Sequence, residues 1–410
     1  MPRASRSLVL NLLHTNLVLF LFSSLALAQV KPGIEVLLAE RLDLVRGKRV
    51  GLITNPTGVT SQLVSTIDAL HAQPQVQLVA LFGPEHGVRG DVSAGNHVAD
   101  MIDARTGIPM YSLYGANKAP TPEMLRNVDL LVYDIQDIGS RAYTYIYTMA
   151  LGMQAAAQTG IPFIVLDRPN PLGGDLIEGP ILDERFKSFI GLYPIPYLYG
   201  LTVGELALYL NKEMGLNAQL TVVPMQGWQR FMLFEDTGLP WVLTSPHVPH
   251  ARTVFHIAAT GCMGELSFVN EGVGYTLPFE LLGQTWIKGE ELAAALNALR
   301  LPGVIFRPLY YRPYYFSLKD QQLSGVQIHL TNPRSFRPML TQLHILKTML
   351  KLYPQQNIFN PERVKNFDQA VGTDSVRLLL LHGTSPDSVY FSWKKDLAKY
   401  REQRKAYLLY

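Results

Sequence analysis

The sequence predicts an α/β fold: a Rossmann-like, doubly wound and mostly parallel sheet, followed by a second, smaller α+β domain. Three observations indicate this class. Short apolar runs alternate with helical stretches up to about residue 240, which is typical of buried parallel strands. Four of these runs end in a polar cluster, as strands do at the ligand-binding edge of an open parallel sheet. The alternation then stops within residues 241–250, where prolines break regular structure.

The elements of the first domain follow from these apolar runs. Strands are predicted at Val50–Ile53, Val76–Phe82, Val128–Tyr133, Ile161–Leu166 and Ala218–Val223. Helices are predicted between them at Ile34–Val45, Gln62–His71, Tyr145–Thr159 and Thr202–Gly215. The last helix has a clear start, because Thr202 followed by Glu205 is a capping-box pattern.

The second domain is expected to mix helices and strands without regular alternation. Helices are predicted at Gly289–Leu299 and Met339–Tyr353, strands at Val304–Arg307 and Val326–Leu330, and a packed terminal helix within Lys394–Tyr410. The predicted organisation is therefore a processing segment at 1–28, a Rossmann-like domain at 29–240 and an α+β domain at 241–410.

The first 28 residues resemble a secretory signal peptide. Arg3 and Arg6 form a positive region, Leu8–Leu27 is mostly apolar, and Ala26–Leu27–Ala28 has the form of a cleavage site. An uncleaved membrane anchor is the alternative, and the polar interruptions of the apolar run argue against it. We therefore expect a periplasmic or secreted protein without stable membrane insertion after cleavage.

Composition excludes several classes of protein. The chain is 48% hydrophobic and 17% charged, as expected of a globular protein with a large core. Loss of Arg3 and Arg6 with the signal segment lowers the formal net charge from +3 to +1, which gives no reason to expect a nucleic-acid partner. Cys262 is the only cysteine, so an intramolecular disulfide is impossible, and we interpret it as a small core residue.

Common cofactor and nucleophile motifs are absent from the sequence. It has no G-x-G-x-x-G after the first strand, no P-loop, no G-x-S-x-G elbow and no H-E-x-x-H, so no cofactor is expected. Residue types that can bind a metal occur at Glu85, His86, Asp134, His247 and His250, without a diagnostic spacing. We therefore expect no metal centre, and a metal-dependent hydrolase remains an alternative.

The segment Gly83–Pro84–Glu85–His86–Gly87 is the sharpest candidate for catalysis. A carboxyl group that follows an apolar strand is partly desolvated, which favours its protonated form and suits a general acid. Flanking glycines let a large substrate approach the backbone. The alternative is a turn in which Glu85 caps the next helix or pairs with Arg89.

Two further clusters supply groups that suit a sugar. Acids, an amide, an arginine and two tyrosines follow the third strand, and carboxylates, amides and aromatic faces are the groups that bind pyranose rings. These residues are Asp134, Gln136, Asp137, Arg141, Tyr143 and Tyr145, and the cluster after the fourth strand adds Asp167, Arg168 and Asn170. Arg141 could also bind a substrate carboxylate with two hydrogen bonds. Internal Asp–Arg ion pairs are the alternative for both clusters.

The second domain offers two loops that resemble site walls. His247 lies in Ser245–His250, and Glu271 lies among glycines in Asn270–Thr276. Glu271 could supply a second carboxylate, since glycoside hydrolysis commonly uses two, and a surface turn is the alternative. The segment Tyr310–Phe316 is rich in aromatic residues and could line a carbohydrate groove or serve in ordinary packing.

Taken together, five motifs resemble one known family, the NamZ-type exo-β-N-acetylmuramidases, which recycle peptidoglycan and were long described as a domain of unknown function. They are G-P-E-H-G at Gly83–Gly87, D-I-Q-D-I-G-S-R at Asp134–Arg141, L-D-R-P-N-P-L-G-G at Leu166–Gly174, E-G-P at Glu178–Pro180 and Y-L-L-Y at Tyr407–Tyr410. The resemblance runs from about Gly33 to Tyr410. It implies a Rossmann-like domain, a smaller C-terminal domain and an active-site cleft between them. It also implies release of N-acetylmuramic acid from the non-reducing end of peptidoglycan fragments, with Glu85 as the leading candidate catalytic carboxylate.

The chain also departs from the family pattern. Where members read S-P-N-M-P and E-G-T-N-L-S-E-G-R-G-T, this sequence has His247 in place of an asparagine, Phe268 in place of a polar residue and Val273 in place of an arginine. An arginine at that position could bind the lactyl carboxylate of muramic acid. Its absence therefore bears on which sugar is accepted more than on the type of reaction.

The leading hypothesis is an exported, exo-acting glycosidase on β-linked amino sugars of peptidoglycan. Glu85 would be the general acid, His86 would orient it, and Asp137, Glu271 or the substrate's acetamido group would stabilise the oxocarbenium-like centre. The expected substrate-binding residues are Asn55, Asp134, Gln136, Arg141, Tyr143, Tyr145, Asp167, Arg168, Asn170 and His247. A non-catalytic periplasmic binder of cell-wall fragments is the second hypothesis.

Overall fold

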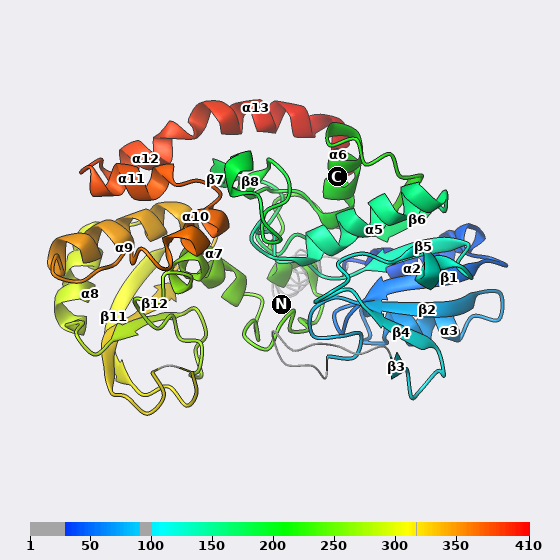
Figure 1. Cartoon of the computed structure of the whole chain (residues 1–410), viewed down its shortest axis with the longest axis horizontal. Helices are drawn as coiled ribbons and strands as arrows, with labels where there is room; N and C mark the ends of the chain where they lie inside the picture. Colours follow the sequence, from blue (N-terminus) through cyan, green and yellow to red (C-terminus); the bar gives the residue numbers. More distant parts are fainter. Residues whose placement is uncertain (1–28, 91–100, 317) are drawn as a thin grey trace, which may run out of the picture.

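The structure is a computed structural model that describes residues 29–90, 101–316 and 318–410. The predicted signal segment at 1–28 lies outside the described residues. Figure 1 shows a large α/β domain beside a smaller domain, with a long terminal helix that spans both. This arrangement confirms the predicted fold class. The predicted boundary near residue 240 falls between the last strand of the large sheet and the first helix of the smaller domain.

The large domain is built on a seven-stranded sheet with the order β3-β4-β2-β1-β5-β6-β9. Five parallel neighbours match the predicted strands: β1 (Arg49–Thr54), β2 (Gln77–Gly83), β5 (Leu130–Asp134), β6 (Phe163–Leu166) and β9 (Leu220–Val223). The remaining two strands, β4 (Pro109–Ser112) and β3 (Met101–Ile102), were not predicted. β4 pairs in parallel with β2, and β3 is antiparallel at the edge.

Helices cover both faces of this sheet, as expected of a doubly wound fold. α2 (Gly33–Glu40) and α3 (Thr66–His71) pack on one face, in a hydrophobic cluster that includes Ile34, Ile67 and Val132. α4 (Pro122–Leu125), α5 (Tyr145–Thr159) and α6 (Val203–Glu213) belong to a second cluster on the other face. The predicted capping box of α6 is present.

The smaller domain contains an antiparallel sheet with the order β10-β12-β11. Its strands are β10 (Leu281–Gln284), β11 (Val304–Tyr311) and β12 (Leu323–Leu330). Its helices are α7 (Thr253–Gly264), α8 (Gly289–Ala298), α9 (Pro338–Leu352), α10 (Val364–Val371), α11 (Ser375–Leu381) and α12 (Pro386–Ser392). Cys262 is buried in α7, within the hydrophobic cluster that continues from the first domain into the second.

The terminal helix α13 (Lys394–Arg404) returns from the smaller domain to the larger one (Figure 1). It crosses the hairpin of β7 (Glu178–Ile181) and β8 (Pro196–Leu198). The Tyr400 hydroxyl donates to the Tyr199 carbonyl at 3.0 Å, and Arg404 donates to the Gly174 carbonyl at 2.8 Å. The prediction of a packed terminal helix is therefore confirmed. In the part of the chain that the structure describes, no helix is both long and apolar enough to cross a membrane.

Candidate active site

The four predicted polar clusters do share one edge of the sheet. They follow β1, β2, β5 and β6, which are parallel neighbours in the order β2-β1-β5-β6. The carboxyl ends of parallel strands point the same way, so the loops after them meet. The side chains in these loops nevertheless have different surroundings, and those surroundings separate candidate catalytic residues from structural ones.

Glu85 lies in a tight turn directly after β2. His86 has a φ of 74° and Gly87 one of 75°, so two successive residues adopt the left-handed conformation, which is uncommon for a histidine. Gly83 is required by close packing, because a Cβ there would lie 2.9 Å from the Val88 nitrogen. Glu85 is half-buried, and Arg89 pairs with Asp103 at 2.9 Å. The turn therefore presents a partly exposed carboxylate.

Tyrosine hydroxyls surround this carboxylate. Burial raises the pKa of Tyr114, and the neighbouring charge of Glu85 raises it further. Burial also raises the pKa of Tyr145, with Tyr143 and then Glu85 as further causes. Asn55 acts on the same phenol, and its side-chain oxygen accepts from the Thr57 nitrogen at 3.0 Å. Asn55, Glu85 and Tyr145 are therefore brought together, as the sequence predicted.

The segment after residue 240 is hydrogen-bonded to Tyr143 and Tyr145, the tyrosines that follow β5. Tyr143 donates to the Thr244 hydroxyl at 3.0 Å, and Tyr145 donates to the Thr244 carbonyl. The two tyrosine rings meet edge to face, with centroids 4.9 Å apart. Thr244 was not predicted as a site residue. Its contacts place the chain that links the two domains against the catalytic candidates.

His247 reaches the site from the same segment. Burial lowers its pKa, and the neighbouring His86 lowers it further. One ring nitrogen of His247 lies 2.9 Å from the Tyr315 hydroxyl, and its ring stacks on that of Tyr315 at 6.2 Å. Phe316 packs against both rings. The aromatic segment Tyr310–Phe316 therefore contacts a residue beside His86.

The expectation that Asp134 and Arg168 bind substrate is not met. Asp134 is fully buried, and Arg168 donates to its two carboxylate oxygens at 2.5 and 2.9 Å. Thr66 donates to the same carboxylate, and the Val59 carbonyl accepts from Arg168 at 2.8 Å. An internal ion pair is therefore present, but it runs between the two clusters and not within either of them, and it joins the loops after β5 and β6.

Asp167 also has a structural role in place of the predicted substrate contact. It is fully buried and accepts hydrogen bonds from Thr202, the Gly204 nitrogen and Tyr410, each at 2.7 Å. Burial raises its pKa to about 7. These contacts attach the start of α6 and the C-terminal residue to the end of β6.

Arg141 does not face a ligand either. Its guanidinium is fully buried and donates to the Val371 carbonyl at 2.6 Å and the Ala370 carbonyl at 3.3 Å, at the end of α10. A cation at a helix C-terminus is favourable, because the last carbonyls carry partial negative charge. Burial lowers the pKa of Arg141. It therefore joins the two domains, and its complete burial speaks against the expected contact with a substrate carboxylate.

The remaining predicted residues of these loops are held by internal hydrogen bonds. Gln136 donates to the carbonyls of Asp137 and Pro169, at 2.7 and 2.8 Å, and Asn170 donates to the Leu201 carbonyl at 2.9 Å. Asp137 is 5% exposed and accepts from Tyr199 and from the Gly139 nitrogen. Burial raises the pKa of Asp137 to about 6, and its second oxygen has no hydrogen-bond partner among the described residues.

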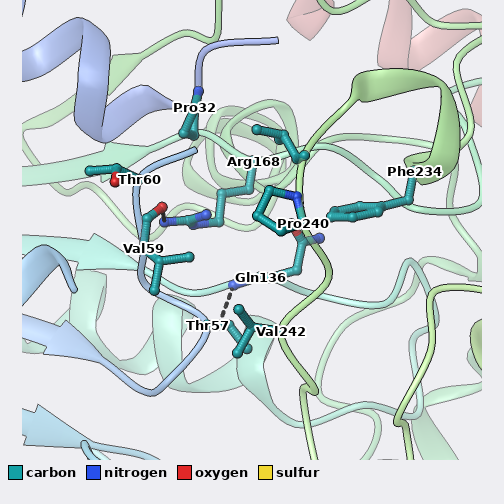
Figure 2. Close-up of a pocket in the computed structure, with 10 residues that line it drawn as sticks. Pro32, Thr57, Val59, Thr60, Gln136, Arg168, Phe234, Pro240 and Val242 are labelled. Atoms are coloured by element: carbon teal, nitrogen blue, oxygen red, sulfur yellow. Dashed lines mark hydrogen bonds between the residues drawn. The ribbon is translucent and has the colours of Figure 1, made fainter. Parts of the chain in front are cut away.

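The crevice between β1 and β5, where a doubly wound sheet usually binds a nucleotide, is filled by side chains. Figure 2 shows Arg168, Phe234 and Pro240 gathered there with Val59. The remaining cavity measures about 20 Å³, which suits a single water molecule. This crevice therefore has no room for a sugar, and the candidate site is the part of the edge beyond β2.

Two larger cavities lie on the side of the smaller domain. One of about 170 Å³ lies between the domains, with Ser140 and Tyr143 on one wall and Glu265 and Phe279 on the other. The second, of about 390 Å³, is lined by Asn270, Glu271, Val273 and Phe316 among others. Glu271 is half-buried, and burial raises its pKa to about 7. Phe316 connects this second cavity to His247.

Sequence reasoning missed two residues beside Glu85. Tyr114 and Lys118 follow β4, a strand that was not predicted. The residues of β4, Pro109–Ser112, do not form an apolar run long enough to indicate a strand.

Within the described ranges, no group of three or more histidine, cysteine, aspartate and glutamate side chains could hold a metal ion.

Comparison with known proteins gives one consistent family. The domain described as "Exo-beta-N-acetylmuramidase NamZ, N-terminal" matches residues 50–252, and the corresponding C-terminal domain matches residues 259–410. The peptidoglycan β-N-acetylmuramidase NamZ of Bacillus subtilis is 49% identical over 382 residues, which cover 93% of this chain and 92% of that protein.

Solved structures agree with this result. A DUF1343 family protein of Bacteroides fragilis has a TM-score of 0.88 at 47% identity, and another from the same organism has a TM-score of 0.76 at 29% identity. Each comparison covers 93% of this chain and 99% of the other chain. The motifs, the two-domain fold and these relatives together show that the chain belongs to the NamZ family of glycosidases.

Proposed function

We propose that this protein is an exported, exo-acting glycoside hydrolase that releases terminal N-acetylmuramic acid from peptidoglycan fragments. The observation that carries the proposal is Glu85, a half-buried carboxylate at the sheet edge whose charge raises the pKa of the neighbouring Tyr114. The relative from Bacillus subtilis is named for the same activity and aligns over nearly the whole chain. Export rests on the sequence of residues 1–28.

Glu85 would act as the general acid that protonates the glycosidic oxygen. Its turn gives it a defined direction, because His86 and Gly87 both hold the left-handed conformation. The phenols of Tyr114 and Tyr145 lie within the electrostatic reach of its carboxylate. His86 would support Glu85 from the adjacent position, beside His247.

The group that stabilises the oxocarbenium-like centre would be Glu271 or the acetamido oxygen of the substrate. Asp137, the other predicted candidate, is 5% exposed and bonded to Tyr199, so it serves better to position its neighbours. Glu271 borders the cavity of about 390 Å³ that Phe316 connects to His247. Two polar walls and exposed aromatic faces are the lining that a sugar requires.

The test is Glu85→Gln, incubated with a disaccharide that carries N-acetylmuramic acid at its non-reducing end, with products read by mass. We expect turnover to fall by about a thousandfold or more, because loss of a general acid removes a factor of roughly 10²–10⁴. The melting temperature should not change, since Gln keeps the shape of the side chain. The matched control is Glu184→Gln, a change of an exposed glutamate outside the site.

Three outcomes decide between the hypotheses. Full activity of Glu85→Gln would remove Glu85 from the mechanism. Tight binding of the disaccharide to the unaltered protein, without any product, would indicate a non-catalytic binder of cell-wall fragments. Activity lost with a chelator and restored by added metal would indicate a metal-dependent hydrolase. Glu271→Gln with the same substrate then separates the two candidates for the second group, because only a direct role predicts a comparable loss.

A further inference from the structure

The proposed substrate carries a carboxylate for which the predicted arginines are not available. Muramic acid differs from glucosamine by a lactyl ether, whose carboxylate is ionised at neutral pH. Arg141 and Arg168 are buried and bonded to protein groups, and position 273 is a valine. A cation that recognises this carboxylate must therefore come from another part of the site.

Lys118 is a cation with the required surroundings. Its ammonium lies 4.6 Å from the centre of the Tyr114 ring and 4.1 Å from the centre of the Phe189 ring. Two aromatic faces hold an ammonium in place without neutralising its charge, so its N–H groups remain able to donate. Lys118 is half-buried and makes no ion pair with any other described residue.

The position of Lys118 relative to Glu85 follows from the sheet. β4 pairs with β2 up to the last residues of both strands, with Gly83 opposite Ser112, so the loops after them begin side by side. Tyr114 joins these loops, because its phenol lies within the electrostatic reach of Glu85 while the Lys118 ammonium lies over its ring. One tyrosine therefore separates the proposed acid from this cation.

The second ring points to the same region. Phe189 is followed by Ile190, which lines the interdomain cavity of about 170 Å³ together with Tyr143. Tyr143 packs against Tyr145, whose phenol lies near Glu85. Lys118 is thus held between the loop after β4, which lies beside that of Glu85, and a segment that borders the interdomain cavity.

We propose that Lys118 binds the carboxylate of the sugar that is cleaved, and so selects N-acetylmuramic acid over amino sugars that lack the lactyl group. This inference rests on the proposed function and adds a specificity residue to it. An ammonium and a carboxylate form a charge-assisted hydrogen bond, which discriminates strongly against a neutral ligand.

The experiment compares two substrates that differ only in charge: the aryl β-glycoside of N-acetylmuramic acid and that of its methyl ester. Lys118→Met keeps an apolar stem against the two rings and removes the charge. We expect its kcat/KM for the acid to fall roughly ten- to a hundredfold, mainly through KM, while its kcat/KM for the ester stays unchanged. Lys118→Arg should recover part of the loss, and Lys212→Met, which removes an exposed charge on α6, should change neither substrate.

An equal loss on acid and ester, or no loss on either, would overturn the role of Lys118. If the unaltered enzyme cleaves neither glycoside, the proposed function fails, and calorimetry still tests Lys118. In that case free N-acetylmuramic acid should bind more tightly than its methyl ester to the unaltered protein and equally to Lys118→Met. Equal binding of the acid and the ester to the unaltered protein, or no binding of the acid, would also overturn the inference.

Discussion

The carboxyl edge of the central sheet has two halves that differ in what their side chains contact. Beyond β5 and β6, Asp134, Asp167 and Arg168 are at most 4% exposed and bond to other parts of the protein. Beyond β2 and β4, Glu85 and Lys118 are half-buried. We call these the closed half and the open half. Each contains an acid and a cation, so residue type does not distinguish them.

The difference comes from what covers each half. Tyr410, the last residue of the chain, bonds to Asp167, and the loop that holds Phe234 and Pro240 fills the crevice between β1 and β5. The loop beyond β2 instead meets His247, which contacts Phe316 at the edge of a cavity. Motif residues of this chain therefore divide between a buried, structural half and a partly exposed half of the edge, and packing decides to which half a residue belongs.

The largest effect that this comparison predicts is for Arg168→Met in the closed half. The variant leaves Asp134 as a buried carboxylate without its cation, which should lower the free energy of unfolding by about 3–5 kcal/mol. Urea denaturation measures this loss. The control is Arg49→Met, which removes a partly exposed pair with Asp129 and should change stability by less than about 1 kcal/mol. Similar losses in both variants would show that burial of the pair is unimportant.

Two buried acids, Asp167 in the closed half and Glu178 in β7, also predict a dependence of stability on pH. Burial raises the pKa of Asp167 and Glu178 to about 7, whereas an unfolded chain titrates these groups near pH 4. Between these values the folded state holds protons that the unfolded state has released, so stability falls as pH rises from about 4 to 7. Each group contributes up to about 1.4 kcal/mol per pH unit in this window. The pKa of Asp103, lowered to about 2 by Arg89, affects stability only below about pH 4.

The measurement is the melting temperature at several pH values between 5 and 8. It should decline towards alkaline pH in the unaltered protein and decline less in Asp167→Asn. Asp175→Asn changes an exposed carboxylate and should keep the original slope. A melting temperature that rises from pH 5 to pH 8 would contradict the assigned protonation of the buried acids.

Much of the fold was predictable because buried parallel strands are continuous apolar runs. β1, β2, β5, β6 and β9 each overlap a predicted strand. β4 was missed because Pro109–Ser112 is short, begins with a proline and is only partly buried, so it lacks that signal. α7 was also not predicted, since an apolar stretch with glycines has no clear helical period.

The site was predictable only in part, for a related reason. Glu85 was found because glycines bracket it directly after a clear strand. Tyr114 and Lys118 were missed together with β4, since their position depends on that strand. The ion pair of Asp134 with Arg168 could not be predicted either. Arg168 lies 34 residues away in the chain and meets Asp134 only because β5 pairs with β6.

A smaller effect on the free energy of unfolding should distinguish Tyr410 from Tyr407, the two tyrosines near the C-terminus. Tyr410→Phe removes a hydroxyl that donates to Asp167 and accepts from the Met225 nitrogen, both at 2.7 Å. Loss of these buried hydrogen bonds should lower stability by about 1–3 kcal/mol with kcat unchanged. Tyr407→Phe removes a bond to Glu213 on the exposed side and should have little effect on either quantity. A loss of kcat in Tyr410→Phe without a loss of stability would place the closed half in catalysis.

The smallest expected effect lies at the wall that the smaller domain adds to the open half. Tyr315→Phe removes the hydroxyl that pairs with His247 at 2.9 Å, while the ring contacts with His247 and Phe316 remain. One partly exposed hydrogen bond is worth about 0.5–1 kcal/mol, so kcat/KM should fall about two- to fivefold without a change in melting temperature. Tyr314→Phe is the matched control, because its ring stacks on Tyr275 at 5.4 Å and should leave kcat/KM unchanged. A variant Tyr315→Phe with lower stability and unchanged kcat/KM would contradict this role. His247 and Tyr315 would then stabilise the smaller domain's side of the site without acting on the substrate. The open half would be limited to the loops after β2 and β4.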